Sequence, residues 1–187
     1  MDDKTDLQVS VGRLHNRYLR TLYRLYGGEL EHTHVLPAMA RLAQTPALRS
    51  ALQYHWEKTH GHAERLRRIL AGLGRPLVDL PRLADPPAAP ETAGWPPALD
   101  AAGCEATLIA GARNLEHHEI MGYLLALNCA QILHETAAAE LLAETLGEEY
   151  EADRILAALA AAVTSPAGWP AEAGAARRPQ PLGTPAV

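Results

Sequence analysis

The sequence predicts an all-α fold, a four-helix bundle, and three observations support this fold class. Four segments place apolar residues at helical spacing, whereas two Pro-rich segments do not. Alanine and leucine dominate the composition, and these two residues lose little side-chain freedom in a helix. A chain of 187 residues is long enough to enclose one hydrophobic core.

The expected helices cover residues 6–43, 45–74, 99–133 and 136–164. The second begins at Thr45-Pro46, an N-cap residue followed by proline at the first helical position. It ends near Gly74, because seven prolines between residues 75 and 97 exclude a regular helix there.

Connection lengths predict how these helices pair. The connections at 43–46 and 134–136 are short, so each joins two antiparallel helices into a hairpin. The long segment 75–97 suits a crossover between the two hairpins. We expect one domain at residues 1–165, followed by a loose tail at 166–187 that lacks core-forming residues.

Charge and cysteine content exclude several classes of protein. The net charge is -5 and the basic residues form no block, so we expect no nucleic acid partner. The polar start at residues 1–4 and the short apolar stretch 155–163 predict neither a leader nor a membrane span. Cys104 and Cys129 on one helix would lie roughly 37 Å apart, too far for a disulfide. We therefore expect a cytoplasmic protein with reduced thiols.

Carboxylates fall within the apolar stripes of three expected helices. On an ideal helix, four core positions lie within about 40° of Glu29: Tyr18, Leu22, Leu25 and Leu36. Glu116 and Glu119 share the stripe of the third helix, and Glu149 and Asp153 share that of the fourth. Five carboxylates are thus expected to point into the core.

Such carboxylates predict a metal site, because an isolated buried carboxylate is strongly unfavourable. No Lys or Arg lies on these stripes to pair with all five, and a pair of divalent ions would satisfy them together. The turn near His134 lies midway between Glu116 and Glu149, which places them at one level. By the same argument, the partner of Glu29 on the second helix should lie near residues 59–62.

The second helix offers two sets of candidate ligands. Glu57 and His60 form a Glu-x-x-His motif, but Glu57 points away from the apolar stripe. His62 lies in the stripe, and so does His55, as an alternative ligand or a neighbour of the site. We favour His62 over the Glu57/His60 pair. Of the other histidines, only His32 shares a face with Glu29, and Tyr26 and Tyr123 are expected in the core near the site.

Six blocks of sequence match those of a known family: 25–29 (LYGGE), 36–40 (LPAMA), 55–62 (HWEKTHGH), 108–110 (LIA), 115–120 (LEHHEI) and 142–153 (LAETLGEEYEAD). On these blocks the chain resembles the YciF/YciE stress-protein family of the ferritin-like superfamily, over about residues 7–160. The resemblance implies a bundle similar to rubrerythrin. Glu116 and Glu119 match its Glu-x-x-Glu on the third helix, and Glu149 matches its Glu-x-x-x-His on the fourth, with Asp153 in the histidine position.

The resemblance implies two iron ions, and the extra carboxylate of Asp153 makes manganese an alternative. Six residues are the expected ligands, with Glu116 as the bridge: Glu29, His62, Glu116, Glu119, Glu149 and Asp153. A metal pair about 3.5–4 Å apart suits oxidation of Fe(II) or reduction of O₂ or peroxide, a ferroxidase or peroxidase activity in stress protection. Two rival hypotheses are a non-catalytic metal-binding or structural stress protein and a metal-free helical interaction module. The chain is also compatible with a homodimer.

Overall fold

The protein is described by a computed structural model that covers residues 3–75, 77 and 101–164. These residues form four helices and no strand, which confirms the predicted all-α class. The helices are α1 (Asp3–Leu42), α2 (Pro46–Gly72), α3 (Ala101–Ile132) and α4 (Thr136–Thr164). No helix in the described part of the chain is long and apolar enough to cross a membrane.

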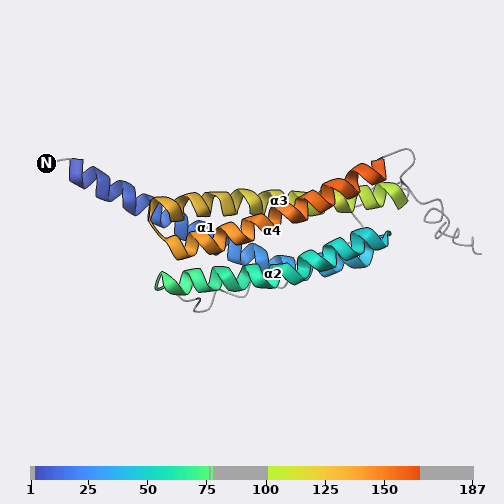
Figure 1. Cartoon of the computed structure of the whole chain (residues 1–187), viewed down its shortest axis with the longest axis horizontal. Helices are drawn as coiled ribbons and strands as arrows, with labels where there is room; N and C mark the ends of the chain where they lie inside the picture. Colours follow the sequence, from blue (N-terminus) through green and yellow to red (C-terminus); the bar gives the residue numbers. More distant parts are fainter. Residues whose placement is uncertain (1–2, 76, 78–100, 165–187) are drawn as a thin grey trace, which may run out of the picture.

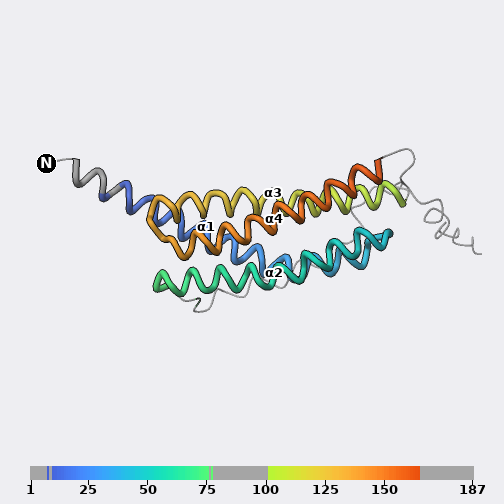
Figure 2. The backbone as a smooth tube through the Cα atoms, viewed as in Figure 1, coloured from blue at the N-terminus to red at the C-terminus, as the bar shows by residue number. Residues whose placement is uncertain are grey.

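The helices form two antiparallel hairpins, α1–α2 and α3–α4, that pack side by side (Figure 1). Helices α1 and α4 each pack against both α2 and α3. The path of the backbone shows α2 and α3 running in the same direction, because α2 ends where α3 also ends (Figure 2). This is the crossover topology that the sequence predicts. The predicted linker, apart from residues 75 and 77, and the predicted tail at 166–187 lie outside the described residues.

Short local signals set the ends of the helices. The Thr45 hydroxyl accepts a hydrogen bond from the Leu48 amide at 3.2 Å, and Pro46 follows as the first helical residue, as predicted. After α2, Gly74 adopts a left-handed conformation with φ 67°. His134 takes the same role after α3 with φ 58°, and the tight turn there places α4 antiparallel to α3.

A buried carboxylate joins the two hairpins at one end of the bundle. Glu105 of α3 has no exposed surface. Its oxygens accept hydrogen bonds from the backbone amides of Gln44 and Thr45, at 2.7 and 3.0 Å, and from the Thr45 hydroxyl. The contact connects α3 to the α1–α2 turn, and so it fixes the level at which the hairpins face each other.

Two apolar clusters fill the bundle, one toward each end. The first contains Tyr18, Leu22, Leu66, Leu70, Tyr123 and Leu142, among others. The second contains Leu36, Leu48, Leu52, Ile109 and Leu156, among others. On every helix, buried ionisable side chains lie between the two clusters, so the bundle has a polar layer in its middle.

We predict that Glu105→Ala destabilises the fold by about 1–3 kcal/mol, because two backbone amides in a protected turn lose their acceptor. Denaturant unfolding followed by circular dichroism measures this change. Glu105→Gln keeps one acceptor oxygen and should lose less. A Glu105→Ala protein within about 0.5 kcal/mol of the parent would contradict the proposed connection between the hairpins.

Candidate metal centre

Six ionisable side chains form the centre of the polar layer, with the buried His32 beside them, and all four helices contribute. They are Glu29 of α1, His55 and His62 of α2, Glu116 and Glu119 of α3, and Glu149 of α4. Each has between 0% and 4% of its surface exposed. Because the two apolar clusters close the layer above and below, these groups are shielded from bulk water.

The six side chains form two groups whose potential ligand atoms lie within 4.8 Å of one another. The first group is His55, Glu116, Glu119 and Glu149, and the second group is Glu29, His62 and Glu149. Glu149 belongs to both.

The two oxygens of Glu149 face different histidines. Its Oε2 lies 3.7 Å from His55 Nε2, and its Oε1 lies 2.7 Å from His62 Nδ1. A carboxylate in this position is suited to bridge two ions, one on each side. Glu116, the bridge that the sequence predicts, lies in the first group, with Oε1 at 3.3 Å from His55 Nε2, and its bridging role stays a prediction.

Most buried polar atoms of the layer have no hydrogen-bond partners outside it. Both oxygens of Glu116, Glu119 and Glu149, together with Glu29 Oε2, His55 Nε2 and His62 Nδ1, face only one another and His32 Nδ1. Such atoms are costly to bury. Carboxylate oxygens and imidazole nitrogens are ligands that divalent iron, manganese and zinc accept, so the residues present fit a metal pair.

When no metal is bound, several groups of this layer carry protons, because burial and neighbouring charges raise their pKa. Burial, together with the charge of Glu149, raises the pKa of Glu116 to about 11. Burial, together with the charge of Glu29, raises the pKa of Glu119 to about 8. For His62, burial favours the neutral ring, but Glu149 and Glu29 outweigh it and raise the pKa to about 10. Metal ions would displace these protons.

A second layer of contacts orients the ligands, and Glu148 is its centre. Glu148 Oε2 lies 3.0 Å from His62 Nε2 and 2.7 Å from Arg65 Nη1, and Lys58 Nζ lies 2.9 Å from its Oε1. Burial works against its charge, but Lys58 and Arg65 prevail and hold the pKa of Glu148 at about 2. The ionised carboxylate accepts a hydrogen bond from His62 Nε2–H, which leaves Nδ1 facing Glu29 and Glu149.

Two further contacts hold the carboxylates of the layer. The Tyr123 hydroxyl donates to Glu29 Oε1 at 2.5 Å. His32 Nδ1 lies 2.8 Å from Glu119 Oε1. The neighbouring Gly122 permits this close approach of α1 and α3, because a Cβ added there would lie only 2.7 Å from the Leu25 side chain.

Comparison with known proteins agrees with this architecture. Residues 13–167 match the sequence profile of the family described as Domain of unknown function (DUF892). The chain belongs to this family. Protein YciF of Escherichia coli K12 is 29% identical over 156 residues, which cover 81% of this chain and 93% of YciF. The DUF892 assignment and the YciF relative confirm the family resemblance seen in the sequence.

Two solved structures share the fold of this DUF892 chain. The crystal structure of the E. coli stress protein YciF superposes with a TM-score of 0.68 at 26% identity, covering 80% of this chain and 96% of that one. YcfI from Rhodopseudomonas palustris, described provisionally as a structural protein, gives 0.65 at 27% identity, covering 77% and 92%.

Within the DUF892 chain, five of the six expected ligands meet in the polar layer, and Asp153 does not. Asp153 Oδ1 lies 2.7 Å from Arg113 Nε and 3.2 Å from His117 Nε2, on the partly exposed side of the α3–α4 contact. Asp153 therefore has cationic partners of its own and is not part of either group. Helical periodicity places Asp153 on the core side, but it carries no information on Arg113, which lies at the same level on the facing helix.

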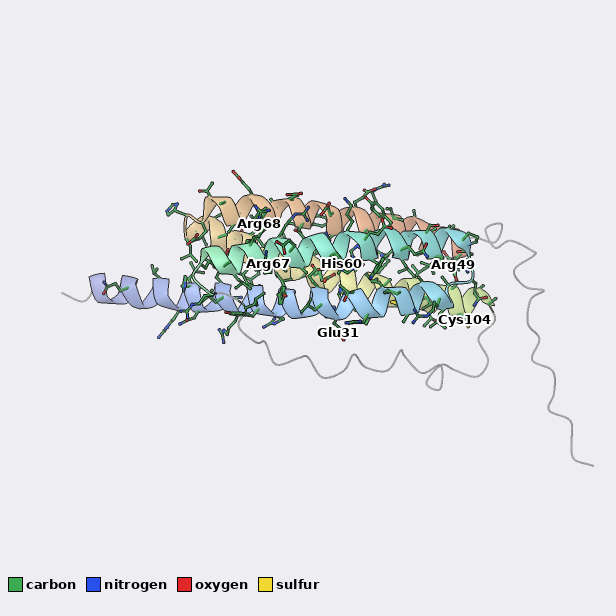
Figure 3. All side chains as sticks on the ribbon, turned by 90° about the horizontal axis from the view of Figure 1, so that it is seen from below. Glu31, Arg49, His60, Arg67, Arg68 and Cys104 are labelled. Atoms are coloured by element: carbon green, nitrogen blue, oxygen red, sulfur yellow. The ribbon has the colours of Figure 1, made fainter. Side chains whose placement is uncertain are left out.

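Helix α2 contributes the residues that its stripe indicated. His62 and His55 are both buried in the layer, whereas Glu57 and His60 are exposed. His60 lies on the outer side of α2 (Figure 3). Sequence reasoning did not identify Glu148. In the sequence, Glu148 is marked only by its position next to Glu149. Because consecutive residues of a helix point in different directions, Glu148 lies beside the layer rather than in it.

We predict that the metal-free protein loses stability as pH rises from 6.5 to 8.5. Over this range the unfolded chain has ionised Glu116 and Glu119 and deprotonates His62 from its ordinary pKa of 6.5, whereas the folded chain keeps the protons of Glu116 and His62 and releases that of Glu119 only near pH 8. Thermal melts of chelator-treated protein should therefore show a lower Tm at pH 8.5. Glu116→Gln should weaken this dependence, and a metal-free Tm that rises with pH would refute it.

We also predict that Glu148→Gln weakens metal binding by about 10–100-fold, because His62 loses the charged partner that orients it. Competition with a chromophoric chelator measures the affinity. The matched control is Glu144→Gln, since Glu144 also pairs with Arg65, at 2.5 Å, but is not a partner of His62. Equal affinities of the two variants would exclude this role for Glu148.

Proposed function

We propose that the polar layer holds two divalent metal ions, and that with iron this centre oxidises Fe(II) or reduces O₂ or peroxide in stress protection. The main observation in support is that seven buried carboxylate oxygens have no polar partners except one another and buried histidine nitrogens, and that they converge on two groups that share Glu149. The description of the relative YciF as a stress protein is consistent with this proposal.

The first group would hold one ion and the second group the other, with Glu149 available to both. Bound iron would supply Lewis acidity and one electron per ion. The chain itself orients the ligands: Tyr123 holds Glu29, and Glu148 holds His62. The apolar clusters on both sides keep bulk water from the layer.

The net reactions balance with either oxidant. Two Fe(II) ions give one electron each to O₂, which takes up two protons and leaves as hydrogen peroxide. With hydrogen peroxide as the oxidant, two electrons and two protons yield two molecules of water. Four carboxylates and two histidines form an oxygen-rich set of ligands, and manganese is therefore an alternative occupant.

We predict that Glu116→Ala abolishes binding of at least one ion, whereas Glu57→Ala has no effect, because Glu116 is buried in the first group and Glu57 is exposed. Elemental analysis of protein purified without a tag measures metal content. Aerobic addition of Fe(II) to the parent should give a ferric absorbance that saturates near two irons per chain. Equal metal content in the two variants would overturn the proposed site.

A structural role of the bound metal is the second candidate, because YcfI is described provisionally as a structural protein. The two candidates differ in one measurement. If metal binds and raises Tm, but consumption of O₂ and peroxide stays at the level of free Fe(II), the centre is structural. If neither metal content nor Tm responds to a chelator, both candidates fail.

A further inference from the structure

The first half of α1 carries a row of four arginines on one face of the helix. Arg13, Arg17, Arg20 and Arg24 follow one another at intervals of four, three and four residues. On an ideal helix these intervals keep the four side chains within an arc of about 60°. All four residues are exposed. Basic residues form no block along the sequence, but the helix gathers these four into one row, which we call the arginine row.

No acidic residue compensates for the arginine row. Residues 8–28 contain these four arginines and no Asp or Glu, although acidic residues outnumber Lys and Arg over the whole chain, 22 to 17. Among the described residues, none forms an ion pair with any of the four. Exposed or partly exposed arginines of the other helices do pair with carboxylates: Arg65, Arg67, Arg113 and Arg154. Like charges three or four residues apart on a helix repel one another, so the row destabilises α1 unless an anion binds to it.

The arginine row is accessible to a large partner. It borders a shallow depression of the surface, whose lining is Arg13, Asn16, Arg17, Leu19, Arg20 and Tyr23. The row also lies next to the N-terminal end of α1, which extends beyond the other three helices (Figure 1). From Arg13 to Arg24 the helix rises by about 16 Å. An extended anionic partner can therefore contact all four guanidinium groups together.

A second copy of this chain does not offer the anionic surface that the row requires. Helix α4 carries most of the exposed acidic residues, but these already have cationic partners within their own chain. Glu144 and Glu148 pair with Arg65, Glu151 pairs with Arg154, and Asp153 pairs with Arg113.

A membrane surface is also a poor partner for the row. A helix that lies on a membrane inserts an apolar face beside its basic face. In this stretch of α1 the apolar face consists of Tyr18, Leu22 and Leu25, and these three residues are buried in the bundle. They are not available to lipid.

The phosphate backbone of a nucleic acid fits the row. One strand of duplex DNA presents a negative charge about every 3.4 Å along the axis, so the length of the row spans about five phosphates. Guanidinium groups pair with phosphates through two parallel hydrogen bonds. We propose that the arginine row of α1 binds the phosphate backbone of duplex DNA without preference for base sequence. A nucleic acid partner, which the order of residues along the sequence argued against, thus follows from their arrangement on the helix.

The first experiment measures how binding depends on salt. A labelled DNA duplex is titrated with the full-length protein, and fluorescence anisotropy is followed at several KCl concentrations. Four phosphate contacts predict that the logarithm of the association constant falls against the logarithm of the KCl concentration with a slope of about −3.6. A duplex of unrelated sequence should give the same affinity and slope. A slope near zero, or a strong preference for one duplex, would overturn the proposal.

The second experiment removes charges from the row. The double variant Arg17→Gln, Arg20→Gln should bind DNA at least tenfold more weakly at low salt, with a slope smaller by about two. Arg17→Lys with Arg20→Lys keeps both charges and should keep the slope. The matched control is Arg67→Gln with Arg154→Gln, because these two exposed arginines each pair with a glutamate three residues away on their own helix. An equal loss of affinity in the control would show that only the total charge matters, and would refute the row as the binding surface.

Thermal melts accompany these variants. Removing two charges that repel their neighbours on α1 should leave Tm unchanged or raise it, so weaker DNA binding cannot be ascribed to unfolding. If the Gln variant melts lower, the comparison is made between the parent and Arg24→Gln, which removes the last charge of the row. Parent-like affinity and slope in a folded variant would overturn the proposal.

Other polyanions test the choice of partner. Vesicles of phosphatidylserine and phosphatidylcholine represent a membrane, and poly-glutamate represents an acidic protein. At equal concentration of negative charge, DNA should bind more tightly than either, and equal or tighter binding of one of them would overturn the choice of DNA. The inference does not rest on the metal centre. Chelator-treated protein should bind DNA like the parent, and the Arg17→Gln, Arg20→Gln variant should keep its metal content, so each proposal can fail without the other.

Discussion

The bundle depends on one constraint, the burial of four carboxylates and three imidazoles in a single layer between two apolar clusters. Seven of the carboxylate oxygens have no polar partners except one another and the buried imidazoles. In the metal-free protein, protons reduce the repulsion, as the raised pKa of Glu116, about 11, indicates. Such a layer is stable only if every helix sits at the correct height, because the groups compensate one another only at close range.

Several contacts outside the layer maintain that height. Glu105 joins α3 to the α1–α2 turn at one end, and Gly122 allows α1 and α3 to approach near the centre. Glu148 orients His62 from the charged side of the α2–α4 contact, and Tyr123 orients Glu29 from α3. Each of these two ligands is therefore held by a side chain of another helix. Glu148 of α4 holds His62 of α2, and Tyr123 of α3 holds Glu29 of α1.

Periodicity was sufficient to find most of the buried acids. Glu29, Glu116, Glu119 and Glu149 lie in apolar stripes of the sequence, and all four are buried in the structure. Asp153 marks the limit of this reasoning. A residue four positions after Glu149 is rotated by about 40° on an ideal helix, enough to reach Arg113 rather than the core. Only the position of the neighbouring helix decides between these two environments.

By itself, the sequence determined the four helices, their pairing into hairpins and which face of each helix is buried, because these follow from spacing and turn residues along one chain. Tertiary structure alone decided that Glu149 is shared by both groups, that Glu148 holds His62, and that a small cavity is lined by His55 and Glu116. Each of these depends on distances between atoms of different helices. Such distances are set by packing, which helical periodicity does not encode.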